Sequence, residues 1–128
     1  MPDAVVATLT KEERITSKRL IDKLFEGGNS HSLAAFPLRL VYMPTELLRP
    51  SQVQLLVSVP KRCFKRAVKR NRVKRQIREA YRKNKYLIPR QDEKGLALAF
   101  IWLDDHLHSS DSVERRIVKL LQRLSERL

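Results

Sequence analysis

Nearly all of the net charge of this 128-residue chain lies in one segment, residues 61–85. The segment holds thirteen Lys or Arg residues and a single acid, Glu79, so it carries +12 of the total of +13. It also contains four apolar side chains at i, i+4, i+7 and i+8: Val73, Ile77, Ala80 and Tyr81. This is the spacing of one helix face, and it predicts an ordered helix from about residue 66 to residue 85 rather than a disordered basic tail.

Polar side chains would lie opposite that apolar stripe. At 100° per residue, the opposite side carries Asn71, Arg75, Arg78 and Arg82, with Arg72 and Lys74 on its flanks. A fixed row of guanidinium groups suits a polyanion with regularly spaced charges, so we interpret the segment as a nucleic-acid-binding helix. A merely solvated helix is the alternative. A membrane-surface helix fits less well, because it needs a larger apolar face that is richer in Leu, Phe or Trp.

Length and composition bound the class of protein. Residues 1–128 are expected to form a single domain, with a disordered N-terminal tail at residues 1–8. No run approaches the roughly 20 apolar residues of a membrane span, and no secretory signal pattern opens the chain. We therefore expect no membrane partner and a cytoplasmic location. The single cysteine, Cys63, excludes an internal disulfide; its basic neighbours would lower its thiol pKa, but with no paired histidine we interpret it as incidental.

The N-terminal half predicts one helix and two strands. Ser17 is a helix-start signal for an amphipathic helix at residues 17–26, which Gly27 and Gly28 end. Residues 33–43 read as a strand, in which Pro37 marks an edge or a bulge, and residues 44–50 read as a loop. Alternating apolar residues predict a further strand at 53–59.

The C-terminal half predicts the remaining elements. Ala67 and Val68 fall off the stripe of the basic helix, so we expect a turn that tucks them inward. Residues 95–103 form the most apolar run and predict a central buried strand. Asp111 and Glu114 read as a capping box that begins an amphipathic C-terminal helix. The order helix, strands, helix, strand, helix predicts a small α+β sandwich.

The sequence offers no convincing catalytic or metal site. His31, His106 and His108 are its histidines, and only the last two lie near acids, Asp104 and Asp105. A solvated turn after a strand explains that stretch better than a metal site, because a second ligand pair is lacking. There is no glycine-rich phosphate-binding loop, since the chain has three glycines. We therefore expect a binding protein with no catalytic residue and no metal of its own.

The basic helix also carries a specific motif. Residues 67–75, AVKRNRVKR, continued by Ile77, Arg78 and Glu79, closely resemble the signature of the bacterial ribonuclease P protein subunit. Other segments agree in order: KRLIDKLFEGGNS resembles the first helix of that family, LLVSVPKR the strand before the motif, and GLALAFIW the strand after it. The resemblance covers roughly residues 9–125.

The resemblance implies a fold that the patterns alone do not give. Members have a four-stranded sheet in the order αβββαβα, with a left-handed β-α-β crossover that breaks the usual right-handed rule. The patterns above predict three strands, so the resemblance implies that residues 33–43 divide in two, at about 33–36 and 39–42.

The resemblance also implies a function. Members bind a large catalytic RNA, the P RNA, and promote endonucleolytic removal of the 5′ leader from precursor tRNA. The RNA, with bound Mg²⁺, performs the hydrolysis, so the enzyme is ribonuclease P as a holoenzyme and the protein alone is not expected to be catalytic. The implied partners are P RNA and precursor tRNA, with no obligate protein partner.

Site residues follow from the resemblance by position. Those implied to bind RNA are Lys61, Arg62, Lys65, Arg66, Arg70, Asn71, Arg72, Lys74, Arg75 and Arg78. A cleft between the first helix and the sheet binds the leader in the family, and its candidates here are Phe25, Phe36 and Arg39. Phe25 and Phe36 would stack on bases, with core packing as the alternative, and Arg39 would hold phosphate in place of an aromatic ring.

Two other functions remain open at this point. A freestanding nucleic-acid-binding protein fits the charge and size equally well, but not the ordered motif around Asn71. A self-sufficient protein nuclease would use Asp104, Asp105 and His106, and would cleave RNA with a divalent ion and no RNA subunit.

Overall fold

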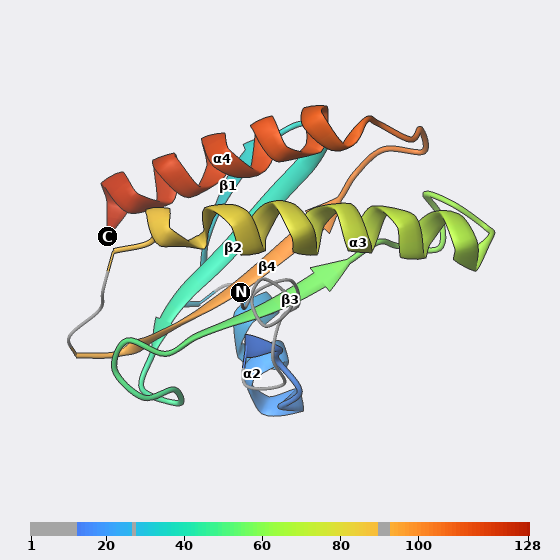
Figure 1. The fold of residues 1–128 in the computed structure, drawn as a ribbon. Coiled ribbons are helices and arrows are strands. Elements are labelled where there is room, and N and C mark those ends of the chain that lie inside the picture. The colour runs from blue at the N-terminus through green and yellow to red at the C-terminus, as the bar shows by residue number, and fades with distance from the viewer. Residues whose placement is uncertain (1–12, 27, 90–92) are drawn as a thin grey trace, which may run out of the picture.

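The computed structural model of the chain describes residues 13–26, 28–89 and 93–128. Its main elements are α2 (Lys18–Glu26), β1 (His31–Ala35), β2 (Leu38–Thr45), β3 (Val53–Ser58), α3 (Ala67–Asn84), β4 (Gly95–Trp102) and α4 (Ser110–Arg127). A short 3-10 helix, η2 (Lys85–Leu87), continues α3 (Figure 1). This is the order αβββαβα that the family resemblance implies. The expected N-terminal tail, residues 1–8, lies outside the described residues.

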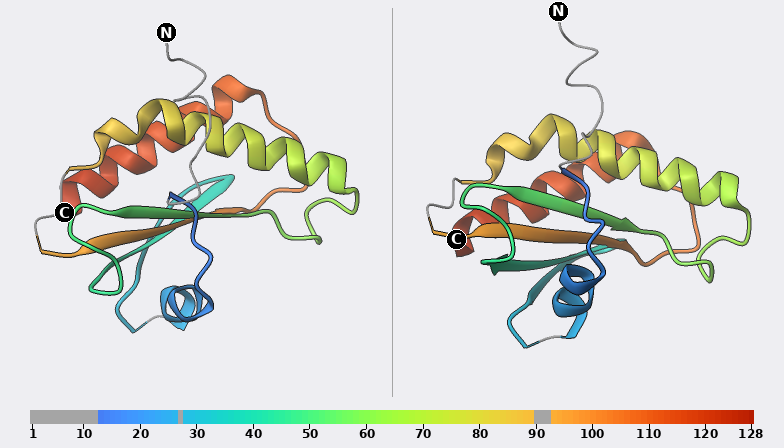
Figure 2. Two further views of the ribbon diagram at one scale, coloured as in Figure 1. Left: turned by 60° about the horizontal axis from the view of Figure 1, so that its bottom comes forward. Right: turned by 90° about the horizontal axis from the view of Figure 1, so that it is seen from below.

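The four strands form one sheet in the order β1-β2-β4-β3. β2 pairs antiparallel with both β1 and β4, whereas β3 pairs parallel with β4. Figure 2 shows α3 and α4 together on one face of the sheet and α2 on the other. The predicted α+β sandwich is therefore confirmed. Among the described residues, no helix is both long enough and apolar enough to cross a bilayer.

The parallel strands β3 and β4 are joined through α3, and this crossover is left-handed. In Figure 1 both strands run to the right, β4 lies above β3, and α3 lies in front of them. If the strands are turned to point upward, β4 comes to the left of β3, whereas a right-handed crossover would put it on the right. About 98% of such connections are right-handed. The exceptional hand that the resemblance implies is present.

The two faces of β4 contribute to two hydrophobic cores. One face points to α3 and α4 and buries the larger side chains: Leu96, Leu98, Phe100 and Trp102. The other face carries Ala97 and Ala99, which pack in a smaller core with Leu20 and Leu24 of α2. The prediction of a central buried strand is confirmed, because β4 has a neighbour on each side and a helix layer over each face.

The predicted strand at residues 33–43 is two strands. Ala35 pairs with Leu38, so Phe36 and Pro37 form a two-residue turn between β1 and β2. Proline cannot continue a strand ladder as donor, and here it ends one strand rather than marking a bulge within it. β2 then runs to Thr45, which pairs with Gly95, so the predicted loop from residue 44 begins later than expected.

The helix starts were predicted with mixed success. The Ser17 hydroxyl accepts a hydrogen bond from the Leu20 amide at 3.3 Å, which confirms the start of α2. The capping box at the start of α4 is wrong: the Ser109 hydroxyl caps the helix by accepting from the Ser112 amide at 3.1 Å. Ser109 lies two residues earlier, so Asp111 falls inside the first turn, where its negative charge still favours the helix N-terminus.

The start of α3 also differs from the prediction. Ala67 and Val68 form its first turn and are exposed, Val68 by 78%. They are not tucked inward, because the preceding loop already buries Cys63 and Phe64 at that end of the core.

Candidate nucleic-acid interface

α3 turns one side to the core and thereby fixes where its cations point. The predicted stripe is buried and is extended by one polar residue: Val73, Ile77, Ala80, Tyr81 and Asn84. The Asn84 amide donates to the Ala80 carbonyl at 2.8 Å and to the Glu114 carboxylate of α4 at 3.0 Å. Burying a hydrogen-bonded amide costs little free energy, so Asn84 is compatible with the orientation of α3 that turns its apolar stripe to the core. The sequence pattern missed Asn84, although it lies four residues after Ala80.

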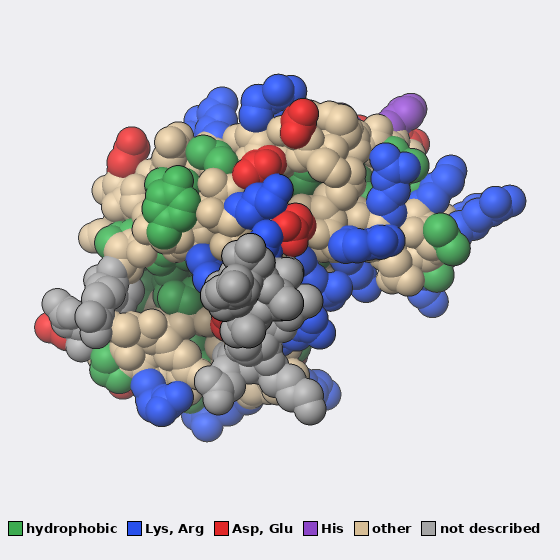
Figure 3. Space-filling view, viewed as in Figure 1, with side chains coloured by type: hydrophobic (Ala, Val, Ile, Leu, Met, Phe, Trp, Pro, Cys, Tyr) green, Lys and Arg blue, Asp and Glu red, His purple; other side chains and the backbone are tan. Residues whose placement is uncertain are grey.

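The N-terminal end of α3 extends past the end of β3 (Figures 1 and 2). Cations are exposed on more than one side of this end of the helix and in the loop before it, so they do not form a single row. We call the exposed polar residues of this end the basic tip: Lys61, Arg62, Lys65, Arg66, Lys69, Asn71, Arg72 and Arg75. Figure 3 shows Lys and Arg side chains, in blue, concentrated at the right of the molecule, where this end of α3 lies. All of these residues except Lys69 were predicted to bind RNA. Lys69 could have been found in the same way, because it is a cation on an exposed turn of the helix.

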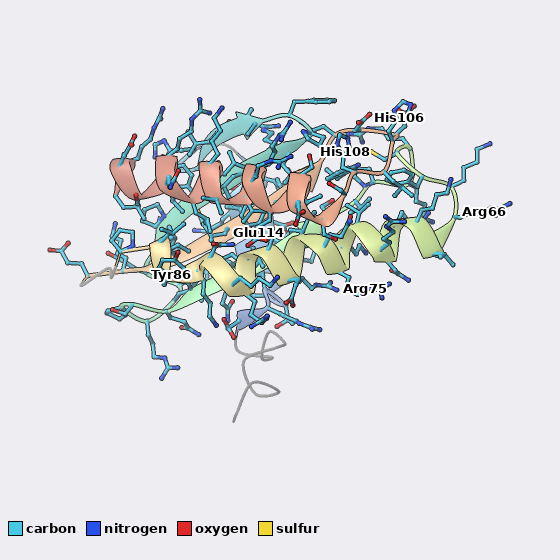
Figure 4. The ribbon with its side chains drawn as sticks, turned by 45° about the horizontal axis from the view of Figure 1, so that its top comes forward. Arg66, Arg75, Tyr86, His106, His108 and Glu114 are labelled. Atoms are coloured by element: carbon cyan, nitrogen blue, oxygen red, sulfur yellow. The ribbon has the colours of Figure 1, made fainter. Side chains whose placement is uncertain are left out.

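Two labelled arginines show how the basic tip is presented. In Figure 4, Arg66 and Arg75 project away from α4, whereas Glu114 points from α4 toward α3. The α-helical rise of about 1.5 Å per residue separates Arg66 and Arg75 by roughly 14 Å along the axis. The basic tip can therefore contact several phosphates of one nucleic-acid strand at once.

The loop before α3 is held in place by buried side chains and by Arg70. The Cys63 amide donates to the Pro60 carbonyl at 3.0 Å, and the Cys63 thiol lies 3.7 Å from the Trp102 carbonyl oxygen. Arg70 Nη1 donates to the Phe64 and Lys65 carbonyls at 2.7 and 2.8 Å. Arg70, predicted as an RNA contact, thus uses its guanidinium group to fix the loop that carries the other cations.

The Cys63 thiol does not have the lowered pKa that its basic neighbours suggested. Burial raises its pKa above the ordinary value, and the charge of Arg62 opposes this shift without overcoming it. Cys63 therefore remains a protonated side chain that packs in the core, rather than the incidental residue that its sequence neighbours suggested.

Toward its C-terminal end α3 uses its cations within the protein. Arg82 donates through Nε to Glu79 at 3.1 Å, and this bond lowers the pKa of the Glu79 carboxyl. Just beyond α3, Lys85 at the start of η2 pairs with Glu13 at 2.8 Å. Arg78 is partly buried, and its pKa is lowered first by desolvation and then by the nearby charge of Arg14. Lys74 is also partly buried, so both predicted contacts flank the basic tip instead of projecting from it.

The three candidates for the leader cleft do not form one cluster. Phe25, on α2, is 47% exposed, which excludes simple core packing for it. Arg39 is exposed and lies on the α2 face of β2, because it alternates with Val41, which packs in the α2 core. Phe36 is 62% exposed but lies at the β1–β2 turn, where its carbonyl accepts from Arg116 of α4 at 3.2 Å. The structure brings Phe25 and Arg39 to one face and leaves Phe36 at the end of the sheet.

The acidic loop after β4 pairs with its own histidines. His108 Nε2 lies 2.8 Å from Asp104, and His106 Nδ1 lies 2.7 Å from Asp105. The hydrogen bond from His108 is the main cause that lowers the pKa of Asp104 to about 2, and the bond to Asp104 raises the pKa of His106. Ligand atoms of Asp104, Asp105 and His106 lie within 4.8 Å of one another. Mg²⁺ favours oxygen ligands throughout, so this mixed group does not suit it.

Comparisons with known proteins agree with this architecture. Residues 9–125 match the family model of Ribonuclease P. The ribonuclease P protein component of Porphyromonas gingivalis is 39% identical over 120 residues, covering 91% of this chain and 86% of that protein. The ribonuclease P protein component of Chlorobium phaeobacteroides is 40% identical over 83 residues, covering 62% of this chain and 56% of that protein.

Solved structures share the fold at lower identity. The RNase P protein from Thermotoga maritima superposes with a TM-score of 0.70 at 23% identity, covering 87% of this chain and 96% of that one. The RNase P protein of Staphylococcus aureus gives 0.67 at 20% identity, covering 88% and 95%. The family match spans the basic helix, the sheet and both flanking helices, and the chain belongs to the ribonuclease P protein family, the protein subunit of the ribonucleoprotein that processes the 5′ ends of tRNA.

Proposed function

We propose that the basic tip is the surface through which this protein binds P RNA. The observation that carries the proposal is the buried support beneath these exposed cations. Cys63 and Phe64 anchor the loop and Arg70 ties it to α3, so the cations are presented from a fixed backbone. Because the geometry is set before binding, less conformational entropy is lost when RNA docks.

The chemistry of the tip suits a phosphate backbone. Arg66, Arg72 and Arg75 offer planar donors that bind two phosphate oxygens at once, and Asn71 can both donate and accept. Each phosphate contact releases counterions, so binding weakens steeply with salt. Mg²⁺ bound by the RNA supplies the charge that phosphodiester hydrolysis requires, and this chain supplies cations that hold the RNA and its substrate in place.

The α2 face is the second part of the proposal. Phe25 is exposed beside a sheet face on which Arg39 is also exposed, so a single strand lying there meets an aromatic ring and a guanidinium group. Stacking and phosphate pairing are both tolerant of sequence, as recognition of varied 5′ leaders of precursor tRNA demands. Phe36, away from this face, is assigned no stacking role.

The expected location is the cytoplasm, where a single buried thiol such as Cys63 stays reduced. The proposal needs no protein partner, since RNA occupies both surfaces.

Leader cleavage of a precursor tRNA at low Mg²⁺ tests the proposal. Protein alone, cognate P RNA alone and both together are compared, and cleavage at the mature 5′ end is expected only with both. Cleavage by the protein alone would move catalysis into this chain and overturn the proposal. No stimulation of the RNA by the protein would also overturn it.

The basic tip is tested separately with Arg72→Gln/Arg75→Gln. We expect roughly tenfold weaker P RNA binding and an unchanged melting temperature, because both side chains are exposed. The matched control is Arg115→Gln/Lys119→Gln, which removes two exposed cations from α4. Equal losses of P RNA binding in the two variants would mean that the tip contributes only through the overall positive charge and is not a specific binding surface.

A further inference from the structure

α2 divides the sheet face on which it lies, and its two flanks differ in chemistry. At 100° per residue, Ile21 and Phe25 fall on one side of the buried pair Leu20 and Leu24. Arg19 and Lys23 fall on the other side, one helical turn apart. Both of these cations are exposed. The proposed leader surface uses the first flank and leaves the second without a role.

A pocket of about 600 Å³ lies against that second flank. Three separate parts of the chain line it: α2 with Arg19 and Lys23, the end of β2 with its following turn, and Lys94 just before β4. The pairing of Thr45 with Gly95 fixes the last two parts relative to each other. The pocket is therefore built by tertiary structure and not by a single basic stretch.

The charge of this pocket is positive and unbalanced. Its lining includes Arg19, Lys23 and Lys94, with Glu46 as the one acid, and His31 adds ring nitrogens. Within the described part of the chain, none of these three cations makes a salt bridge, and all are exposed. Three cations that converge on a pocket with a single acid favour an anion, and a phosphate group is the anion that Arg and Lys bind together most readily.

A second hollow of about 400 Å³ lies next to this pocket. The two share Arg19 and Leu47, and the second adds polar side chains, among them Ser17 and Gln52. We call these two adjacent hollows the groove beside α2. Together they offer more room than one phosphate ion needs.

This groove is separate from the basic tip. It lies on the α2 face, and Lys94 stands at the start of β4, whereas the tip follows the end of the parallel strand β3 on the way to α3. The eight residues of β4 extend roughly 25 Å. One phosphate group cannot contact both sites.

We propose that the groove beside α2, with Arg19, Lys23 and Lys94 as its cations, binds the phosphodiester backbone of an RNA strand. The proposal rests on the proposed function, because it takes RNA as the partner, and it adds a contact site that the family signature does not contain. Two RNAs can supply that backbone: P RNA itself, or precursor tRNA bound by the holoenzyme.

The test variant is Arg19→Gln/Lys23→Gln, and Lys94→Gln removes a cation from a distant part of the sequence that lines the same pocket. The α4 pair Arg115→Gln/Lys119→Gln is the control. Binding is measured for P RNA with the free protein, and for precursor and mature tRNA with the holoenzyme, over a range of salt. We expect roughly tenfold weaker binding for the double variant in one arm, and a log–log salt slope smaller by about 1.4 to 1.8 for two lost contacts.

The two arms identify the source of the strand. A loss in the P RNA arm assigns the groove to the RNA subunit. A loss confined to precursor tRNA, with mature tRNA unchanged, assigns it to the leader. If the groove variants bind as well as the α4 control in every arm, the groove proposal is overturned. The proposed function would still stand if Arg72→Gln/Arg75→Gln binds P RNA more weakly in the same experiment. Melting temperatures equal to that of the parent chain confirm that the exposed substitutions leave the fold intact.

Discussion

Arg70 Nη1 lies 2.7 Å from the carbonyl oxygen of Phe64, and this bond makes Arg70 different from the arginines around it. Phe64 is buried in the core, so the bond connects α3 to a fixed point. The neighbouring Arg75 is exposed. By sequence alone, the two residues belong to one motif and look equivalent.

Arg70→Ala is therefore expected to lower stability as well as RNA binding. Two carbonyls lose a charged donor, and a cost of about 1 to 2 kcal/mol is expected because the site is only partly buried. Arg75→Ala is the matched control and should leave the free energy of unfolding unchanged while it weakens binding. Urea unfolding of both variants measures this, and equal stabilities would contradict the anchoring role of Arg70.

Gly95 is expected to tolerate no side chain. An added Cβ would clash with the Leu48 Cβ and would lie 2.7 Å from the Arg49 carbonyl oxygen, and backbone cannot give way cheaply. Gly95→Ala should cost about 1 to 3 kcal/mol through overpacking. Gly28→Ala is the control, since a Cβ there meets nothing within 4 Å. Thermal unfolding of the two variants distinguishes them, and a neutral Gly95→Ala would be inconsistent with this packing.

The Asp104 loop is expected to contribute stability in a defined pH window. The pKa of Asp104 is lowered to about 2, so its contribution is present above its ordinary value of 3.8 and is lost as pH falls toward 2. The pKa of His106 is raised, so its contribution is present below 6.5 and is lost as pH rises through the raised value.

Asp104→Asn should therefore lower the melting temperature more at about pH 5.5 than at about pH 8.5. Asp111→Asn, on the exposed first turn of α4, is the control for removing one carboxylate. Differential scanning calorimetry at both pH values measures the change. A penalty that does not vary with pH would mean that protonation of the paired histidine adds nothing to stability.

Cys63 is expected to react slowly with thiol reagents in the native protein. Its thiol is buried and its pKa is raised by that burial, so little thiolate is present near neutral pH. Alkylation by iodoacetamide at about pH 7.5 should be at least roughly a hundredfold slower than in urea. Bound P RNA should change the native rate little. Fast native alkylation would show that the loop opens and that its anchoring is weak.

The periodic parts of this fold could be read from sequence, and the non-local parts could not. The stripe of α3 and the apolar run of β4 were predicted because each is a local pattern with one dominant environment. The division at Pro37 needed the family resemblance, since apolar residues continue on both sides of the turn. The cap of α4 was misplaced because two polar residues within one turn can each serve.

The site divides in the same way. The cations of the basic tip follow from the helix period and the signature, so most were predicted. The loop-anchoring role of Arg70 depends on where the Phe64 carbonyl lies in space. The groove beside α2 combines Arg19 with Lys94, which are 75 positions apart, and no local pattern relates them.

The handedness of the β3-α3-β4 connection determines on which faces of the sheet the basic tip and the groove beside α2 lie. A right-handed path between the same strands would carry α3 to the side of the sheet where α2 lies. The basic tip and the groove beside α2 would then lie on the same face of the sheet. Because the path is left-handed, the sheet stands between them. The two proposed RNA surfaces therefore lie on opposite sides of the sheet, and RNA strands bound to both would be held apart by the thickness of the protein's layers.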